Sequence, residues 1–273
     1  MSERRVVLVT GSTDGIGRQT ARSLAAAGLK VIIHGRGKSK VDGAIASLMD
    51  ELPGAELEGV SFDLASFTAV RRGVEHILAR LPALHVLVNN AGIFSAERVT
   101  TEDGIEATLA VDHLGPFLLT ELLAPRLEAS ATEAPSRVIN VASIAHTRGR
   151  IHTDDLQLAS AWTGYAAYAQ AKLANVMHTI SLSERHSPDK LVAYSLHPGV
   201  VSTKLLRQGF GPVQGATVEV GARTIVRLAS ASEVDAPSGS YFMDGVVTTP
   251  SAAARDDKLR AFLWDASVRL TKP

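Results

Sequence analysis

Short runs of β-branched and other apolar residues alternate along the chain with stretches whose apolar positions recur at helical spacing. The first kind predicts strands buried on both faces, at residues 5–10, 31–34, 57–62, 84–88, 137–142 and 191–196. The second kind predicts helices at residues 15–27, 39–52, 67–80 and 165–186. This alternation is typical of an α/β fold, in which a doubly wound parallel sheet carries helices on both faces. Ligands of such sheets bind at the carboxyl ends of the strands, so we expect functional residues there.

The chain contains no repeat, low-complexity tract or linker that would divide it, so we expect one domain over residues 1–273. Two connections are long, at residues 144–164 and from Pro198 to about Gly215. Long connections in compact domains are often functional, which predicts substrate loops near 144–164 and 200–215. Four apolar side chains in these connections are candidate pocket walls, although each could equally belong to the core: Trp162, Leu205, Leu206 and Phe210.

Composition excludes several classes of function. Basic and acidic residues number 28 each, so the chain lacks the basic excess that nucleic-acid binders usually carry. No run of 18 apolar residues occurs, and the apolar run 6–9 is too short for a signal peptide, so we expect no membrane partner and no export. The absence of cysteine excludes disulfides, thiolate zinc sites and a cysteine nucleophile, and it fits a cytoplasmic protein. The nine histidines show no metal-ligand spacing, so we expect no metal.

A glycine-rich turn follows the first predicted strand and opens the first predicted helix, with the sequence Thr10-Gly11-Ser12-Thr13-Asp14-Gly15-Ile16-Gly17. Gly11 permits a tight turn, Gly15 lets the backbone approach a pyrophosphate, and Gly17 lets the helix pack closely on the strand. The N-terminus of the helix then presents free N–H groups to phosphate. Turns collect glycine for many reasons, but the strand–turn–helix context favours a dinucleotide-binding site.

The end of the second predicted strand should carry the residue that selects between NAD and NADP, and it reads His34-Gly35-Arg36-Gly37-Lys38. A carboxylate that would bond the 2′-hydroxyl of NAD is missing, whereas the Arg36 guanidinium suits a 2′-phosphate. The pattern therefore favours NADP(H), and NAD(H) stays open because a solvated basic loop has the same composition. Asp63 and Leu64, after the third strand, are placed to border the adenine, although Asp63 could equally cap a helix.

A tyrosine and a lysine lie four residues apart on the last predicted helix, at Tyr168 and Lys172, and therefore share one face. A nearby ammonium favours tyrosinate, so we expect the pKa of Tyr168 to move down toward working pH, as proton exchange with an alcohol or carbonyl requires. Such pairs also arise by chance on helices. Tyr165 is a competing tyrosine, but position 169, four residues later, is Ala169 rather than lysine.

Three ordered motifs together resemble the short-chain dehydrogenase/reductase family over nearly the full length. They are the glycine turn 10–17, the sequence Asn89-Asn90-Ala91-Gly92, and Tyr168-x-x-x-Lys172. The stretches 112–120, 168–175, 197–203 and 238–242 and the pair Leu263-Trp264 are similar to its retinol-dehydrogenase-like branch. The resemblance implies a Rossmann-type fold and an oxidoreductase that moves a hydride directly between a nicotinamide and a small alcohol or carbonyl. Members often pair through the helices after the fourth and fifth strands, which makes a homodimer or homotetramer one expectation.

The resemblance also implies roles for single residues. Ser143 would hydrogen-bond the substrate oxygen, and Lys172 would also bond the nicotinamide ribose. Asn90, Ala91 and Gly92 would line the adenosine ribose. The nicotinamide end of the cofactor would be held by four residues that follow the sixth strand: Pro198, Gly199, Val200 and Thr203.

One position departs from the family pattern. Many members have asparagine where this chain has Asp112, and that asparagine organises a water leading to the lysine. An ionised aspartate accepts hydrogen bonds but cannot donate one, so the relay would be altered. The alternative is that Asp112 only bonds backbone at a helix kink.

Two other functions stay open at this point. One is a protein that senses a dinucleotide without turning it over; the intact Ser143, Tyr168 and Lys172 argue against it, and Asp112 argues mildly for it. The other is light- or electron-coupled reduction of a carbon–carbon double bond, as in protochlorophyllide reductases, whose functional cysteines this chain lacks.

Overall fold

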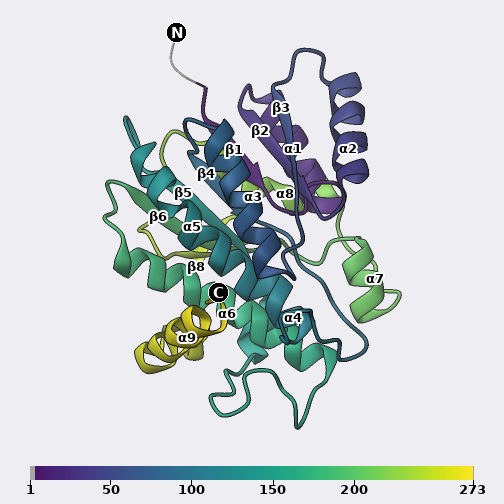
Figure 1. Ribbon diagram of the computed structural model, residues 1–273, viewed down its shortest axis with the longest axis vertical. Coiled ribbons are helices and arrows are strands. Elements are labelled where there is room, and N and C mark those ends of the chain that lie inside the picture. The colour runs from purple at the N-terminus through teal and green to yellow at the C-terminus, as the bar shows by residue number, and fades with distance from the viewer. Residues whose placement is uncertain (1–3, 273) are drawn as a thin grey trace.

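Strands and helices alternate along residues 4–272, which the computed structural model describes (Figure 1). The domain bounds expected from the sequence, 1–273, begin and end outside the described residues. The strands are β1 (Val6–Val9), β2 (Lys30–Gly35), β3 (Leu57–Ser61), β4 (Val86–Asn89), β5 (Ser136–Val141), β6 (Leu191–His197), β7 (Tyr241–Met243) and β8 (Val246–Thr248). Within the described residues they form one sheet in the order β3-β2-β1-β4-β5-β6-β7-β8. Every neighbouring pair is parallel except β7 and β8.

Helices cover both faces of this sheet. The α-helices are α1 (Gly15–Ala26), α2 (Lys38–Glu51), α3 (Phe67–Arg80), α4 (Ala107–Leu109), α5 (Gly115–Ala129), α6 (Gly164–Arg185), α7 (Lys204–Phe210), α8 (Val218–Ser230) and α9 (Asp257–Leu270). A π-helix, η1 (Ala110–Leu114), joins α4 to α5, and two 3₁₀ helices are η2 (Ile144–Arg148) and η3 (Ala253–Arg255).

The side chains of β1 show how the two faces are built. Val6 and Leu8 pack into a core with α3 and α5, whereas Val7 and Val9 pack into a second core with α1, α2 and α8. Successive side chains of a strand point to opposite faces, so a strand covered on both sides must be apolar at every position. That is why the sequence of β1 reads as an unbroken apolar run. The helix α9 packs against α6 beside the C-terminus (Figure 1).

The fold class and the elements predicted from the sequence are confirmed, with ends shifted by up to two residues. Two features differ. The sheet is not wholly parallel, because the short strand β8 turns back beside β7. The second long connection is not all loop, because Thr203 caps a helix, α7, by accepting a hydrogen bond from the N–H of Leu206.

The helical run Ala107–Ala129 is long and apolar enough to cross a membrane by length and composition alone. It is the one such run among residues 4–272, and 83% of its apolar window is buried inside the protein. Leu119, Leu123 and Leu127 of this run lie in the core against α3. The run is therefore the central helix on one face of the sheet.

Candidate active site

A cavity of about 1550 Å³ opens at the carboxyl ends of the strands. It is lined by nearly all the site residues predicted from the sequence: Gly11, Thr13, Asp14, Gly15, Ile16, Gly17, Arg36, Asp63, Leu64, Asn90, Ala91, Gly92, Ser143, Tyr168, Lys172, Pro198, Gly199, Val200 and Thr203. Two predicted residues, Ser12 and Asp112, are fully buried and do not line it. The cavity therefore joins the glycine turn to the tyrosine–lysine pair.

The glycine turn has the geometry that its sequence suggests. Gly11 and Gly15 have φ angles of 63° and 57°, which side chains disfavour. A Cβ on Gly17 would lie 2.3 Å from the carbonyl oxygen of Gly11, so only glycine lets α1 come this close. The Ser12 hydroxyl donates to the Val9 carbonyl and accepts from the N–H of His34. Its side chain closes the turn instead of facing the cavity.

Two residues that the sequence analysis did not single out hold this turn in place. The N–H of Gly11 donates to His34 Nδ1, and His34 Nε2 lies 3.2 Å from the Phe62 carbonyl, which can only accept. Burial lowers the pKa of His34 to about 4, so the ring is neutral and can fill both roles. The Thr10 hydroxyl accepts from the N–H groups of Asn90 and Ala91, which ties β4 to the turn.

Basic side chains border the end of the cavity beyond β2. Arg36 and Lys40 are exposed and line it, whereas Lys38 makes an ion pair of 2.6 Å with Asp42 on the outer side of α2. Lys40, four residues after Arg36 in the first turn of α2, was missed because the sequence analysis ended at Lys38. The Asp63 carboxylate accepts from the N–H of Ala65 just before α3, so it also shapes the turn there.

The tyrosine and the serine face each other across the cavity. Tyr168 lies on α6, and the Nζ of Lys172 is 5.4 Å from the centroid of its ring. Ser143 follows β5 and caps η2, where its Oγ accepts from the N–H of Ala145 at 3.2 Å. Because that contact uses only a lone pair of Oγ, the hydroxyl proton is available for a hydrogen bond, which it makes with the phenol of Tyr168. The arrangement places an O–H donor and a phenol at one point of the cavity.

Asp112 makes a buried ion pair with Lys172. Its Oδ2 lies 3.0 Å from Lys172 Nζ, and its Oδ1 accepts from the N–H of Ile93 at 2.8 Å. Asp112 lies in the π-helix η1, a distortion that is frequent at functional sites and here directs the carboxylate at the lysine. A Cβ on Gly92 would lie about 3 Å from both charged groups. Asp112 therefore bonds backbone, as one alternative held, but it also contacts Lys172.

The pKa of Tyr168 moves in the direction opposite to the one expected from the sequence. Burial has the largest effect and raises the pKa of Tyr168. The Lys172 ammonium and a hydrogen bond with Ser143 lower this pKa, whereas the Asp112 carboxylate raises it. The net direction is upward. Burial lowers the pKa of Lys172, but Asp112 and Tyr168 outweigh burial and raise it. Lys172 therefore stays protonated, while the phenol of Tyr168 stays neutral.

Aromatic side chains surround the phenol. Phe210, on α7, has its ring centroid 5.9 Å from that of Tyr168, and Phe94 lies 5.8 Å from it. Leu205, Leu206 and Phe210 line the cavity as predicted walls, whereas Trp162 does not: its Nε1 donates to the buried carboxylate of Glu106. The contribution of Phe94 was missed because it follows β4 with no motif of its own.

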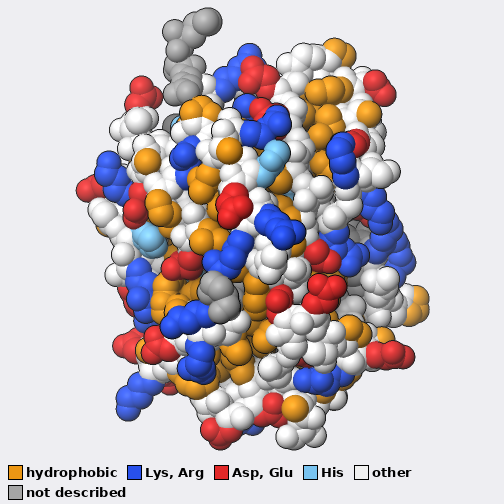
Figure 2. All heavy atoms as spheres, viewed as in Figure 1, with side chains coloured by type: hydrophobic (Ala, Val, Ile, Leu, Met, Phe, Trp, Pro, Cys, Tyr) orange, Lys and Arg blue, Asp and Glu red, His pale blue; other side chains and the backbone are white. Residues whose placement is uncertain are grey.

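An ion pair fastens α7 to the glycine turn. Lys204 Nζ lies 2.5 Å from the carboxylate of Asp14, the residue that caps α1. Lys204 and Arg207 both line the cavity, and Figure 2 shows basic side chains gathered at the edge of the molecule where Figure 1 places α7. This edge is therefore positively charged beside the turn that is predicted to bind phosphate.

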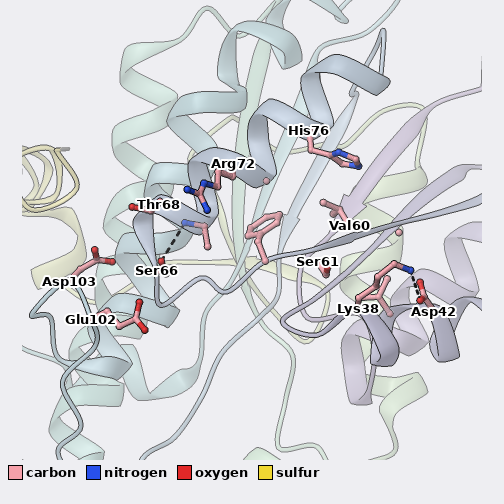
Figure 3. Close-up of a pocket in the computed structure, with 15 residues that line it drawn as sticks. Lys38, Asp42, Val60, Ser61, Ser66, Thr68, Arg72, His76, Glu102 and Asp103 are labelled. Atoms are coloured by element: carbon pink, nitrogen blue, oxygen red, sulfur yellow. Dashed lines mark hydrogen bonds and ion pairs between the residues drawn. The ribbon is translucent and has the colours of Figure 1, made fainter.

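A second cavity, of about 730 Å³, lies at the outer edge of β3 between α2 and α3 (Figure 3). Arg72 and His76 border it from α3, and Lys38 and Asp42 border it from α2. None of the predicted catalytic residues lines it. Among residues 4–272, no group of three or more histidine, cysteine, aspartate or glutamate side chains could hold a metal ion.

Comparisons with known proteins agree with this geometry. Residues 5–210 match the short chain dehydrogenase family. The chain is 38% identical to "Retinol dehydrogenase 12" of Homo sapiens over 275 residues, 97% of this chain and 86% of that protein. It is also 38% identical to "Polyprenol dehydrogenase" of Mus musculus, over 98% of this chain and 84% of that protein.

Solved structures share the fold. A crystal structure of an uncharacterised protein from Mycobacterium Paratuberculosis has a TM-score of 0.81 and 34% identity, covering 98% of this chain and 93% of that one. The structure of NADPH-bound carbonyl reductase from chicken fatty liver has a TM-score of 0.70 at 24% identity, covering 90% and 99%. The second likeness supports the fold alone.

Proposed function

The chain belongs to the short-chain dehydrogenase family, and we propose that it is an NADP(H)-dependent oxidoreductase that interconverts an apolar carbonyl and its alcohol, with Tyr168 as the acid and base. One observation carries the proposal. The phenol of Tyr168, the hydroxyl of Ser143 and the ammonium of Lys172 line one cavity that is continuous with the glycine turn. The aromatic rings of Phe94 and Phe210 beside the phenol support an apolar substrate.

The residues of the cavity fit a nicotinamide dinucleotide. Glycines at positions 11, 15 and 17 leave the N-terminus of α1 open, where a Cβ on Gly17 would strike backbone. The N–H groups of such a helix start stabilise phosphate. Arg36 and Lys40 line the other end and supply the positive charge that a 2′-phosphate needs. When bound, the nicotinamide would supply or accept the hydride at the substrate carbon.

The side chains of this chain would move the proton. In the direction of reduction, Ser143 donates a hydrogen bond to the substrate oxygen, and Tyr168 gives its phenolic proton to the same oxygen as negative charge develops there. The Lys172 ammonium stabilises the tyrosinate that results. Because the net shift of the Tyr168 pKa is upward, the phenol is protonated at neutral pH. A raised pKa favours the phenol that carbonyl reduction needs over the tyrosinate that alcohol oxidation needs, so we propose that reduction is the faster direction at neutral pH.

The test is a turnover assay of the purified chain with NADPH and a panel of apolar aldehydes and ketones, followed by NADPH absorbance. Tyr168→Phe should lose on the order of 10²–10⁴ in rate because it lacks the proton, while its affinity for NADPH stays close to that of the unmodified chain. Tyr165→Phe is the matched control, since this tyrosine lines the same cavity one turn earlier on α6. Full turnover by Tyr168→Phe would remove it from the mechanism. Tight NADPH binding without any turnover by the unmodified chain would favour a dinucleotide sensor.

A further inference from the structure

His146 connects the serine of the site to the C-terminal part of the chain. It lies in η2, three residues after Ser143, and its ring is buried. Its Nδ1 is 2.8 Å from the carbonyl oxygen of Ser143, and its Nε2 is 3.3 Å from the backbone nitrogen of Ser251. Ser251 lies beyond β8, more than a hundred residues away in the sequence.

These two contacts determine which ring nitrogen carries the proton. A carbonyl oxygen only accepts, so Nδ1 must donate to Ser143. A backbone N–H only donates, so Nε2 must accept from Ser251. The neutral Nδ1–H form satisfies both contacts, whereas a protonated ring would lose the second. Burial lowers the pKa of His146, which maintains the neutral form.

We propose that His146 is a positioning residue, which holds the backbone of Ser143 so that the serine hydroxyl points into the cavity; the inference rests on the proposed function of Ser143. The Ser143 carbonyl accepts from both the N–H of His146 and its ring, and the serine backbone is extended at φ −158° and ψ 160°. These bonds fix the peptide plane that follows Cα of Ser143. The Oγ of the serine is held from the same side by the N–H of Ala145.

Two residues late in the chain hold the ring itself. Tyr241 of β7 has its ring centroid 4.7 Å from that of His146, and Ser251 donates to Nε2. The neighbouring Ala254 of η3 packs with Leu173 of α6, the residue after the catalytic lysine. Because the ring is anchored on both sides, it can restrain Ser143 more firmly than the local turn alone can.

Two substitutions separate the hydrogen bond from the packing. His146→Phe keeps a ring against Tyr241 but removes both polar contacts. His146→Asn loses the ring, but its side-chain N–H₂ takes the place of Nδ1 and can still donate to Ser143. His152→Phe is the control, since this histidine belongs to the same connection and does not line the cavity. The readouts are kcat, KM for one carbonyl substrate, NADPH affinity and the thermal unfolding midpoint.

The expected result is a fall in kcat of up to about tenfold for His146→Phe, the range that one lost hydrogen bond spans. NADPH affinity should stay unchanged, and His146→Asn should regain most of the rate. Adding His146→Phe to Ser143→Ala should cause no further loss, because a residue that acts through Ser143 has nothing left to position. Full activity of His146→Phe, no rescue by asparagine, or additive losses in the double variant would each overturn the proposal.

A separate measurement distinguishes failure of this inference from failure of the proposed function. The ¹⁵N shifts of the His146 ring, assigned by comparison with His146→Asn, report which nitrogen is protonated without any turnover. Protonated Nδ1 and bare Nε2 are expected for the unmodified chain. The opposite tautomer would overturn the positioning role even in an active enzyme. An inactive chain with the expected tautomer would refute the proposed function, and with it any catalytic role for His146.

Discussion

Asp112 pairs with Lys172, the lysine next to the proposed proton donor, and replacing it by asparagine should shift the pH dependence of both directions of the reaction. The carboxylate raises the pKa of Tyr168, so its removal should lower that pKa. Alcohol oxidation requires tyrosinate and rises with pH through the pKa of Tyr168, whereas carbonyl reduction requires the phenol and falls through the same pKa. Both limbs should therefore move to lower pH in Asp112→Asn.

The distances in the site give the size of the shift. Asp112 Oδ2 lies 3.0 Å from Lys172 Nζ, which lies 5.4 Å from the centroid of the Tyr168 ring. The carboxylate is thus at most about 8 Å from the ring, and at that distance an effective dielectric constant near 20 gives roughly 2 kcal/mol. One pKa unit corresponds to about 1.4 kcal/mol, so we expect a shift of roughly one and a half units.

The predicted downward shift of the Tyr168 pKa requires that Lys172 stays protonated in Asp112→Asn. Asp112 also raises the pKa of the lysine, so the substitution leaves burial to lower it. As long as Lys172 keeps its proton at neutral pH, the downward shift of the Tyr168 pKa follows. If the lysine lost its proton instead, the pKa of Tyr168 would move up, because the ammonium that lowers it would be gone.

The assay is the pH dependence of kcat/KM for oxidation and for reduction, measured with one substrate pair on both proteins. NADPH affinity and the thermal unfolding midpoint serve as controls, because removing one partner of a buried ion pair is destabilising. Burial raises the pKa of Asp112, so superimposable profiles would show that Asp112 is neutral or that its charge does not reach Tyr168. An upward shift would refute the assumption that Lys172 stays charged.

Two further substitutions test the cofactor site. Arg36→Ala should weaken the affinity for NADP(H) by about ten- to a hundredfold and the affinity for NAD(H) little, because only NADP(H) has a 2′-phosphate. The measurement is a titration with both cofactors, and the control is Lys38→Ala, because the Lys38 ammonium pairs with Asp42. Equal weakening of both affinities by Arg36→Ala would remove Arg36 as the selector. Gly17→Ala should lower both the thermal midpoint and NADPH affinity, because its Cβ would lie 2.3 Å from a backbone oxygen. The control is Gly43→Ala on α2, where a Cβ would meet open space, so this variant should raise the thermal midpoint slightly. Equal changes in the thermal midpoint of the two variants would contradict the packing argument for Gly17.

The sheet could be predicted from the sequence because most of its central strands are short runs dominated by apolar, mainly β-branched residues. β1 and β4 are buried along their whole length, and strands of this kind stand out as unbroken runs. The run of helix from Ala107 to Ala129 was not assigned, because a helix buried nearly all round lacks a polar face and therefore a helical period. The strands β7 and β8 have three residues each, too few to show alternation.

The residues of the site also divide into those that the sequence identifies and those that only the structure shows. Gly11 follows a strand end and Tyr168 shares a helix face with Lys172, so pattern and spacing identify them, whereas the role of Ser143 was implied by the family resemblance. The residues that hold them use tertiary contacts instead. His34 reaches the glycine turn from the next strand, and Asp112 is aimed by a π-helix that no residue pattern in the sequence marks.

We therefore expect common residue types that tertiary structure places around the motif to influence its activity. Asp112 places a carboxylate next to Lys172, the neighbour of Tyr168. The hydroxyl of Ser12, on the glycine turn, donates to the Val9 carbonyl instead of to a ligand. The sequence marks Asp112 as a departure from the family pattern, but it shows neither the ion pair with Lys172 nor the inward-turned hydroxyl of Ser12. A chain could thus keep Tyr-x-x-x-Lys and still have a shifted pH profile through Asp112 or a lower rate through His146. Activity measured on variants of these supporting residues, more than on the motif itself, would establish whether this chain is an enzyme tuned toward reduction.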